Sequence, residues 1–486
     1  MKVLSLSVRL LSFVISLCVL VPSCGANADI DNRYQITSAS GDVVGHTERE
    51  VIPLGDGGRQ VVIRSELLQR EENTSTRRIR EEVITSEDAS GKVSEILHHY
   101  RIGRHAAQTS VAIEGSTATI TCDVRGDRRH VTIVLPTNIR FDRGAALLTA
   151  LEPGAEVSLE FHELDIKAPA LQRVTLREID TAIADGTRIF ERRVFQQGVL
   201  RDVSRSAYDP SGQLLHTERP MFGTSYRAAE TTREAKRNKF RASSIVEGAL
   251  VKSPVRISAS ARAGHVRYAF SFAKGVAFLP PSTGEQRVTE TENGFVLDIC
   301  TNCGPGLPKD EAYLTAALQP GFWLQSDHKE LRKFARKIGS LNVSDTEKME
   351  RLAHKARRRL GEIDFAGHFS ALEAMRMRRG DCTEGAVVLA ALGRAAGIPT
   401  RVVSGIVYSR ERYHGVSHAF MPHAWTLAFV DGEWRSFDMS LDGFDTTHVA
   451  FSIGEGDPTS IAAAHQMAGM LNWEAVNEVR RRPKKD

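Results

Sequence analysis

The sequence has few cysteines, little net charge and no long apolar run beyond its first residues. Its 486 residues include six cysteines, which excludes a disulfide-dense scaffold. Lysine and arginine number 64 against 60 acidic residues, a balance that gives no indication of a nucleic-acid partner. A polytopic membrane protein is likewise excluded. What is present, 41% hydrophobic and 26% charged residues, is typical of a folded, soluble chain of roughly two to four domains.

The N-terminal segment has the pattern of an export signal. A basic start precedes a short apolar run over residues 10–21, and small residues follow it. The small residues at 26–28 fit a cleavage site, so residues 1–28 are predicted to be a signal peptide and the mature chain to be periplasmic or in the cell envelope. A second interpretation is a lipoprotein signal ending before Cys24, which would carry a lipid tether. No transmembrane span is expected in the mature chain.

The remaining cysteines divide into a close pair and two single thiols. Cys300 and Cys303 are predicted to form a local disulfide, because no second ligand pair follows at zinc-finger spacing and no βαβ pattern supports a redox role. Cys122 lies in a strand-like run and is interpreted as an inert packed thiol. Cys382 is then left without a partner.

The chain is predicted to be α+β, with an antiparallel β-rich domain first. Strand-like runs separated by turn signals fill residues 29–225, which suggests a sandwich or open half-barrel of unknown function. Residues 226–245 are charged and predict a linker or solvated helix. Strand signals return over 246–318 and lead into a region of helices and strands over 319–460. Residues 461–486 are expected to form a helical, basic tail.

Cys382 is predicted to lie at the start of a helix. The apolar run that follows it is stopped by Gly397 and Pro399, as a helix C-terminus should be. At a helix N-terminus the dipole and free N–H groups favour a thiolate, so we expect a lowered pKa for the Cys382 thiol. Asp381, directly before it, is expected to support the site.

A hairpin downstream supplies the complementary groups. If Asp431-Gly432 forms a two-residue turn, Val430 pairs with Glu433. His423 and Asp438 then become diagonal neighbours on one face, within reach of a hydrogen bond. A carboxylate in that position would orient the imidazole and stabilise its protonated form.

The site inferred from these residues is a Cys-His-Asp triad. Cys382 would be the nucleophile, His423 the base and Asp438 the group that orients the base. His418 is a weaker candidate base, because an extended strand places it on the opposite face. Taken singly, each residue also has an ordinary structural interpretation: a packed thiol, a buried core histidine and a strand-ending aspartate.

These residues resemble the transglutaminase-like superfamily, in an exported, bacterial type of member. The resemblance covers roughly residues 320–455 and rests on the following motifs: Gly380-Asp381-Cys382-Thr383-Glu384, Arg394 to Arg401, His423-Ala424-Trp425, Trp434, Asp438 and the stretch from Asp442 to Val449. It implies a papain-like α+β core, with Cys382, His423 and Asp438 as the triad and Trp425 packed beside the histidine. No calcium-loop signature, metal site or cofactor is expected, and the family's oxyanion-hole side chain is not located.

The expected function is thiolate attack on a protein or peptide amide through a thioester acyl-enzyme. An amine acceptor would make the reaction a transamidation, and water would make it a peptidase, amidase or deamidase reaction. The same triad serves all of them. A second class of function, a non-catalytic binding or scaffold protein, is kept open by the large β-rich region.

Overall fold

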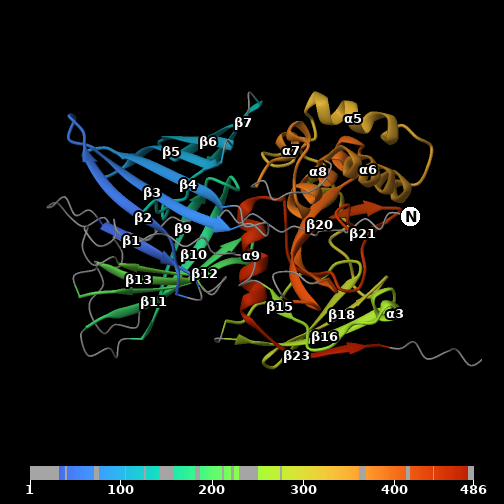
Figure 1. Ribbon diagram of the computed structural model, residues 1–486. Coiled ribbons are helices and arrows are strands. Elements are labelled where there is room, and N and C mark those ends of the chain that lie inside the picture. The colour runs from blue at the N-terminus through green and yellow to red at the C-terminus, as the bar shows by residue number, and fades with distance from the viewer. Residues whose placement is uncertain are drawn as a thin grey trace, which may run out of the picture. The chain divides into compact units, whose positions relative to one another are not determined.

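The computed structural model describes two compact units, one within residues 32–228 and one within 250–479. The described residues are 32–38, 41–70, 76–103, 105–124, 127–142, 158–180, 186–210, 213–219, 224–228, 250–273, 276–360, 368–411, 416–441 and 443–479. The expected signal peptide, the lipid tether at Cys24 and residues 480–486 of the expected tail lie outside them. Figure 1 shows the elements of each unit.

The first unit is one antiparallel sheet whose 14 described strands follow one another in a long meander. Their order in the sheet is β8-β7-β6-β5-β4-β3-β2-β1-β14-β13-β12-β11-β10-β9. The strands are β1 Asn32–Thr37, β2 Val43–Pro53, β3 Arg59–Arg70, β4 Thr76–Glu87, β5 Val93–Ile102, β6 His105–Glu114, β7 Thr117–Val124, β8 Asp127–Val134, β9 Ser158–Asp165, β10 Ala170–Asp180, β11 Arg188–Gln196, β12 Val199–Tyr208, β13 Leu214–Arg219 and β14 Thr224–Ala228. The predicted antiparallel, β-rich N-terminal region is thereby confirmed.

The two faces of this sheet differ in chemistry, as alternating strand residues should make them. One face buries an apolar cluster from β4 to β7, including Val111 and Ile120, which are both fully buried. The other carries cross-strand ion pairs: Arg64 Nε lies 2.7 Å from Glu82 Oε1 on the next strand. This face also has a hollow, and nearly all of the residues that line it are polar.

The second unit combines two antiparallel sheets with seven described helices. Its strands are β15 Val251–Lys252, β16 His265–Phe272, β17 Gln286–Thr291, β18 Gly294–Cys300, β19 Thr400–Ser409, β20 Ala419–Val430, β21 Glu433–Phe437, β22 Val449–Gly454 and β23 Leu471–Glu478. Its helices are α3 Ala259–Arg262, α4 Glu311–Ala316, α5 Lys329–Gly339, α6 Asp345–Leu360, α7 Ala371–Met377, α8 Cys382–Ala395 and α9 Pro458–Gly469. One sheet has the order β17-β18-β16-β23, and the other has β15-β20-β19-β22, with β21 also paired to β20.

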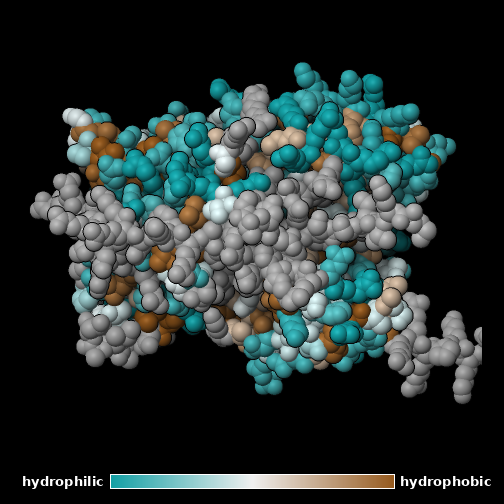
Figure 2. Space-filling model, in the orientation of Figure 1, coloured by the Kyte–Doolittle hydropathy of each residue, from teal (hydrophilic) through white to brown (hydrophobic). Residues whose placement is uncertain are grey.

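Helices α5, α6 and α7 gather around α8 (Figure 1). Helix α8 is apolar around nearly its whole circumference, and all residues from Cys382 to Arg394 are buried. Helix α5 is amphipathic, burying Leu331, Ala335 and Ile338 while its lysines and arginines face outward. The outer surface over α5 and α6 is accordingly hydrophilic in Figure 2. The outer helices therefore cover a central helix that could not be exposed to water.

The hairpin has the predicted register. Val430 pairs with Glu433, and the turn residues Asp431 and Gly432 both have positive φ values, 51° and 85°. Such a turn matches the twist of the two strands, and the Asp-Gly pair accommodates it at little cost. The register brings the end of β21 back beside the middle of β20.

Two expectations about segments were wrong in part. Residues 226–228 belong to strand β14 rather than to a linker, and residues 229–245 lie outside the described part of the chain. The tail expected to be helical contains strand β23 after α9. This strand pairs with β16, and the Trp473 ring packs against Phe270 with ring centroids 4.8 Å apart. Cross-strand packing of this kind overrides local helical preference.

Candidate active site

Cys382 is held as the first residue of helix α8 by the residues around it. Asp381 is the N-cap and accepts a hydrogen bond from the Thr383 N–H at 2.8 Å. Glu384 completes a capping box, because its carboxyl group accepts the Asp381 N–H at 2.9 Å. Such reciprocal bonds satisfy N–H groups that a helix start would otherwise leave open. The position of the cysteine is therefore fixed by its own helix.

The Cys382 thiol is buried, and its pKa is opposite to the sequence-based prediction. Burial raises this pKa well above its ordinary value, and the nearby carboxylate of Asp381 raises it further. A hydrogen bond from the Ala424 N–H to the sulfur acts in the other direction but is outweighed. The predicted lowering of the pKa at the helix N-terminus was therefore wrong, because desolvation by burial is the largest contribution. Burial thus favours the neutral thiol over the thiolate.

His423 and Asp438 form a buried pair, as the hairpin register predicted. His423 Nε2 lies 2.7 Å from Asp438 Oδ2, and each side chain is 1% exposed. The other ring nitrogen, Nδ1, is buried and has no hydrogen-bond partner among the described residues. His423 directly precedes Ala424, whose N–H reaches the Cys382 sulfur. The ring is thus anchored at one nitrogen and open at the other.

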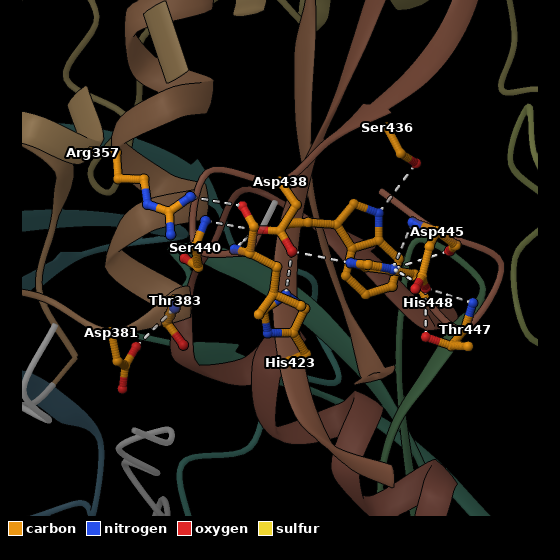
Figure 3. A network of polar contacts seen from close by, with 12 residues as sticks. Arg357, Asp381, Thr383, His423, Ser436, Asp438, Ser440, Asp445, Thr447 and His448 are labelled. Atoms are coloured by element: carbon orange, nitrogen blue, oxygen red, sulfur yellow. Dashed lines mark hydrogen bonds and ion pairs between the residues drawn. The ribbon is translucent and has the colours of Figure 1, made fainter. Parts of the chain in front are cut away.

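Asp438 is an acceptor for more than one side chain. Its Oδ1 accepts the N–H groups of Ser440 and Leu441 at 2.7 and 3.2 Å. Its Oδ2 lies 3.0 Å from Nε2 of a second histidine, His448, as well as close to His423. These contacts hold the pKa of the Asp438 carboxyl well below its usual range, despite its burial. Figure 3 shows Asp438 between the two rings.

Trp425 lies against the imidazole and is itself held in place. Its ring stacks on His423 at a centroid distance of 6.1 Å. Its Nε1–H donates to Ser436 Oγ at 3.2 Å, and Ser436 Oγ donates to Glu285 Oε2 at 3.0 Å. Glu285 is buried in a segment close in sequence to strand β17. A chain of contacts therefore runs from the segment just before β17 to the histidine.

Comparison with known families identifies this region. Residues 332–439 match the family model described as Transglutaminase-like superfamily. This part of the chain is a transglutaminase-like domain. No curated protein matches the chain.

Several solved structures resemble parts of the chain at low sequence identity. A "Putative Cysteine Protease" from Cytophaga hutchinsonii is 17% identical over 44% of this chain and 86% of its own, with a TM-score of 0.26. The periplasmic domain of TgpA from Pseudomonas aeruginosa, bound to ethylmercury, is 14% identical over 39% and 88%, with a TM-score of 0.26. A β-barrel-like protein of a domain of unknown function from Brucella abortus is 10% identical over 42% and 98%, with a TM-score of 0.31.

Within the transglutaminase-like domain, the structure brings together the residues that the sequence singled out. Cys382, His423, Asp438, Trp425 and Asp381 all lie at or beside the start of α8 and the middle of β20.

The other histidine and the cysteine pair lie apart from this group. His418 Nδ1 lies 2.7 Å from the Tyr408 hydroxyl, away from Asp438. Cys300 and Cys303 are joined as a disulfide at the end of β18. Among the described residues, no helix is long and apolar enough to cross a membrane.

Two residues that contact the site were not predicted from the sequence. His448 follows Asp438 by ten residues, and Glu285 precedes the domain's matched region altogether. His448 could have been noticed as a histidine just before a strand, Val449–Gly454, but nothing local connects Glu285 with Trp425. Both are placed by sheet pairing between distant segments.

Three side chains of the domain lie close enough to be considered as a metal site. One ligand atom from each of His423, Asp438 and His448 lies within 4.8 Å of the others. The hydrogen bonds from both rings to the one carboxylate oxygen already account for this closeness. We therefore assign no metal to the cluster.

Proposed function

We propose that the chain is a cysteine-dependent acyl-transfer enzyme that acts on amides of proteins or peptides. One observation carries the proposal: His423 is buried, anchored at Nε2 by Asp438 and open at Nδ1, next to the residue that contacts the Cys382 sulfur. A nucleophile, a base and an orienting carboxylate in this relation are what acyl transfer through a thioester requires.

The reaction begins with transfer of the thiol proton from Cys382 to His423. The sulfur attacks the carbonyl carbon of the amide and forms a carbon–sulfur bond. When the carbon–nitrogen bond breaks, the His423 imidazolium gives its proton to the departing amine, and a thioester remains. A second amine, or water, then attacks the thioester, and the thiol regains its proton. Asp438 keeps the ring oriented and stabilises its protonated form throughout.

The raised pKa of the thiol indicates that the proton moves during the reaction rather than before it. Because burial keeps Cys382 neutral at rest, the thiolate is formed as His423 accepts the proton and the substrate carbonyl approaches. Stray reaction of the sulfur with small electrophiles should consequently be slow at mildly acidic pH. This differs from a cysteine enzyme with a preformed thiolate–imidazolium pair.

The same geometry serves transamidation and hydrolysis, so the test must separate them. The full chain is incubated with a glutamine-bearing protein and a fluorescent primary amine, and mass spectrometry follows the products. Amine incorporation, deamidation and chain cleavage give different mass changes. We expect at least one of them, with transamidation as the first candidate and peptidase, amidase or deamidase activity as the second.

Variants connect the reaction to the proposed residues. Cys382→Ala should lower the rate by more than about 10³-fold, and His423→Gln by roughly 10²–10⁴-fold. Cys122→Ala and His418→Gln are matched controls for a thiol and a histidine outside the site, and should retain the rate. A Cys382→Ala protein that still forms all products would refute the proposed nucleophile. A wild-type protein with no reaction on any amide would favour a binding or scaffold role.

We further propose that the chain is exported to the periplasm or cell envelope. The support is the basic, then apolar, then small-residue order of its first 28 residues. N-terminal sequencing of the protein from cell fractions would show Asp29 if the signal is cleaved there. A lipid-modified Cys24 as the first residue would show the lipoprotein alternative.

A further inference from the structure

Asp438 is shared by two buried imidazoles. His423 Nε2 and His448 Nε2 lie 2.7 and 3.0 Å from the same oxygen, and each ring is 1% exposed. The other carboxylate oxygen is occupied by backbone N–H groups. The carboxylate thus has two imidazole partners that compete for one oxygen in a buried site.

His448 is placed so that its doubly protonated form is satisfied. Its Nδ1 lies 3.0 Å from the backbone oxygen of Asp445 and 3.3 Å from the carboxylate oxygen of the same residue. Asp445 accepts the Thr447 N–H at 2.9 Å, and the Arg262 guanidinium lies 3.6 Å from its other oxygen. Both ring nitrogens of His448 therefore face oxygen atoms, and the Asp445 N–H, 3.2 Å from Nδ1, is an alternative donor to that nitrogen in the neutral ring.

The charges around His448 favour its cationic form. Burial by itself lowers the pKa of a histidine, but the hydrogen bonds and charges of Asp438 and Asp445 outweigh it and raise the pKa of His448 to about 9. Among the described residues, the polar groups of neighbouring elements include Arg262 of α3, which contacts Asp445, and Tyr268 of β16, whose hydroxyl donates to the Thr446 oxygen. Arg357 of α6 donates to the Leu441 oxygen.

The aromatic rings packed on His448 add no charge of their own. They are Trp425 and Phe444, at centroid distances of 5.2 and 4.9 Å. The charge balance of the group therefore depends on the two carboxylates, the two imidazoles and the Arg262 guanidinium.

We propose that His448 is a positioning residue that carries a positive charge against Asp438 and so limits how strongly Asp438 stabilises protonated His423. The proposal deepens the function proposed above and rests on His423 being the base. The two rings have centroids 5.5 Å apart, so the charge on one acts directly on the other. His448 also fixes the Asp438 carboxylate, through the same oxygen that contacts His423.

This arrangement suits a base that must also release its proton. If Asp438 acted on His423 alone, it would stabilise the imidazolium more strongly, and the ring would give its proton to the departing amine less readily. The opposing charge of His448 makes the His423 imidazolium more acidic. It thereby also disfavours transfer of the Cys382 proton before a substrate is bound.

The direct test is the titration of His423 in the full chain. Imidazole nitrogens are labelled with ¹⁵N and followed by nuclear magnetic resonance from pH 5 to 10 in the wild type and in His448→Gln. Glutamine can still donate to Asp438 but carries no charge. We expect the titration of His423 to move upward by roughly one to two pH units, from two charges about 5.5 Å apart in a protein interior. Arg435→Gln, which removes an exposed charge nearby, is the matched control and should leave it unchanged.

Alkylation of Cys382 by iodoacetamide, resolved by peptide mass spectrometry, provides a second readout. A more stable imidazolium favours the thiolate–imidazolium pair, so His448→Gln should react up to roughly tenfold faster at pH 7. If His448→Gln does not fold, Asp445→Asn keeps the histidine and removes one of its carboxylates. The pKa of His448 should then fall from about 9 towards its ordinary value.

The outcomes separate this inference from the proposed function. An unchanged His423 titration in a folded His448→Gln protein, or a His448 that titrates near pH 6.5 in the wild type, would overturn the inference. A shifted titration in a protein that transfers no acyl group would support the charge relation and count against the proposed reaction alone.

Discussion

At the scale of single residues, the site depends on one carboxylate that many groups share. Asp438 is buried, accepts two backbone N–H groups and faces two imidazoles. Asp438 directly follows the last residue of β21, so the hairpin places it beside His423, while later residues make its other contacts. Buried charges are retained in proteins when hydrogen bonds and opposite charges compensate for the lost water. Removal of this carboxylate should therefore affect reactivity and stability together.

Asp438→Asn is expected to lower acyl transfer by roughly 10²–10⁴-fold. The amide no longer stabilises the protonated form of His423, and it can present an N–H group to the ring in place of an acceptor. The variant should also unfold more easily, by about 3–5 kcal/mol, because His448 loses a buried partner. Rates with the amine assay and denaturant unfolding would measure both effects. Asp431→Asn, at the exposed turn, is the control, and an equal loss of rate there would contradict the assignment.

A buried histidine outside the site gives a pH-dependent stability. Burial of His465 in α9 lowers its pKa from 6.5 to about 3, although a hydrogen bond to the Ile461 backbone opposes this. As the pH falls, His465 is protonated near pH 6.5 in the unfolded chain, whereas in the folded chain it stays neutral down to about pH 3. The folded state is therefore destabilised as pH falls from 6.5 towards 3, by up to about 1.4 kcal/mol per pH unit.

His465→Gln removes this titration and allows it to be measured. The free energy of unfolding of the wild type relative to the variant should fall by roughly 2–3 kcal/mol between pH 6.5 and 4.5. Other titrating groups are common to both proteins, so the difference isolates His465. A difference that stays constant over this range would show that His465 is already protonated, or not buried, in the folded protein.

At the scale of elements, the site is built where helix α8 and three strands meet. Strand β19 lies between β20, which carries His423, and β22, which His448 precedes. Gly405 on β19 pairs with His423 on one side and with Ala450 on the other. A β-carbon at Gly405 would lie 1.9 Å from the Val449 backbone oxygen. The absence of a side chain there is what allows β22 to approach.

Gly405→Ala is consequently expected to destabilise the protein by about 3 kcal/mol or more, since the backbone of β22 must move. Displacement of β22 would also move His448 away from Asp438. Denaturant unfolding and the His448 nuclear magnetic resonance signal would report the two effects. The control is Gly321→Ala, where no atom lies within 4 Å of the added β-carbon, with an expected change below about 0.5 kcal/mol. Equal effects of the two variants would contradict this account of β19.

At the scale of the whole molecule, the chain divides into two units with separate cores. The unit that contains the transglutaminase-like domain is larger than the region 319–460 expected from sequence, because β16, β17, β18 and β23 form one of its sheets. This sheet carries aromatic packing around Phe270, and the segment beside it supplies Glu285. A fragment that is to fold and keep the site must therefore include both this sheet and the segment with Glu285.

A fragment of residues 249–486 is expected to unfold cooperatively and to keep the pH dependence of Cys382 alkylation seen in the full chain. A fragment of residues 319–486 lacks β16, β17 and β18, leaves β23 unpaired and loses the Glu285–Ser436 contact. It should therefore be unstable or aggregate. Circular dichroism melting and peptide-resolved alkylation would compare the two. A stable, reactive 319–486 fragment would show that the sheet of β17, β18, β16 and β23 is dispensable.

Much of the site could be predicted because its determinants are local. Asp381 and Glu384 lie within one turn of Cys382, so the helix start can be recognised from a short stretch. The Asp-Gly turn fixes which residues of the hairpin face each other, and with them the pairing of His423 and Asp438. Turn chemistry and helix capping involve few residues and short sequence separations, which is why they can be read before any fold is known.

The sequence by itself determined where the helix begins, how the hairpin pairs and which family the segment 332–439 resembles. Only the tertiary structure decided the protonation of the thiol, because burial depends on every element packed around α8. Only it placed His448 on Asp438 and Glu285 behind Trp425, and only it turned the expected helical tail into strand β23. Desolvation and sheet pairing both depend on residues far apart in the chain, so a local sequence pattern does not predict them.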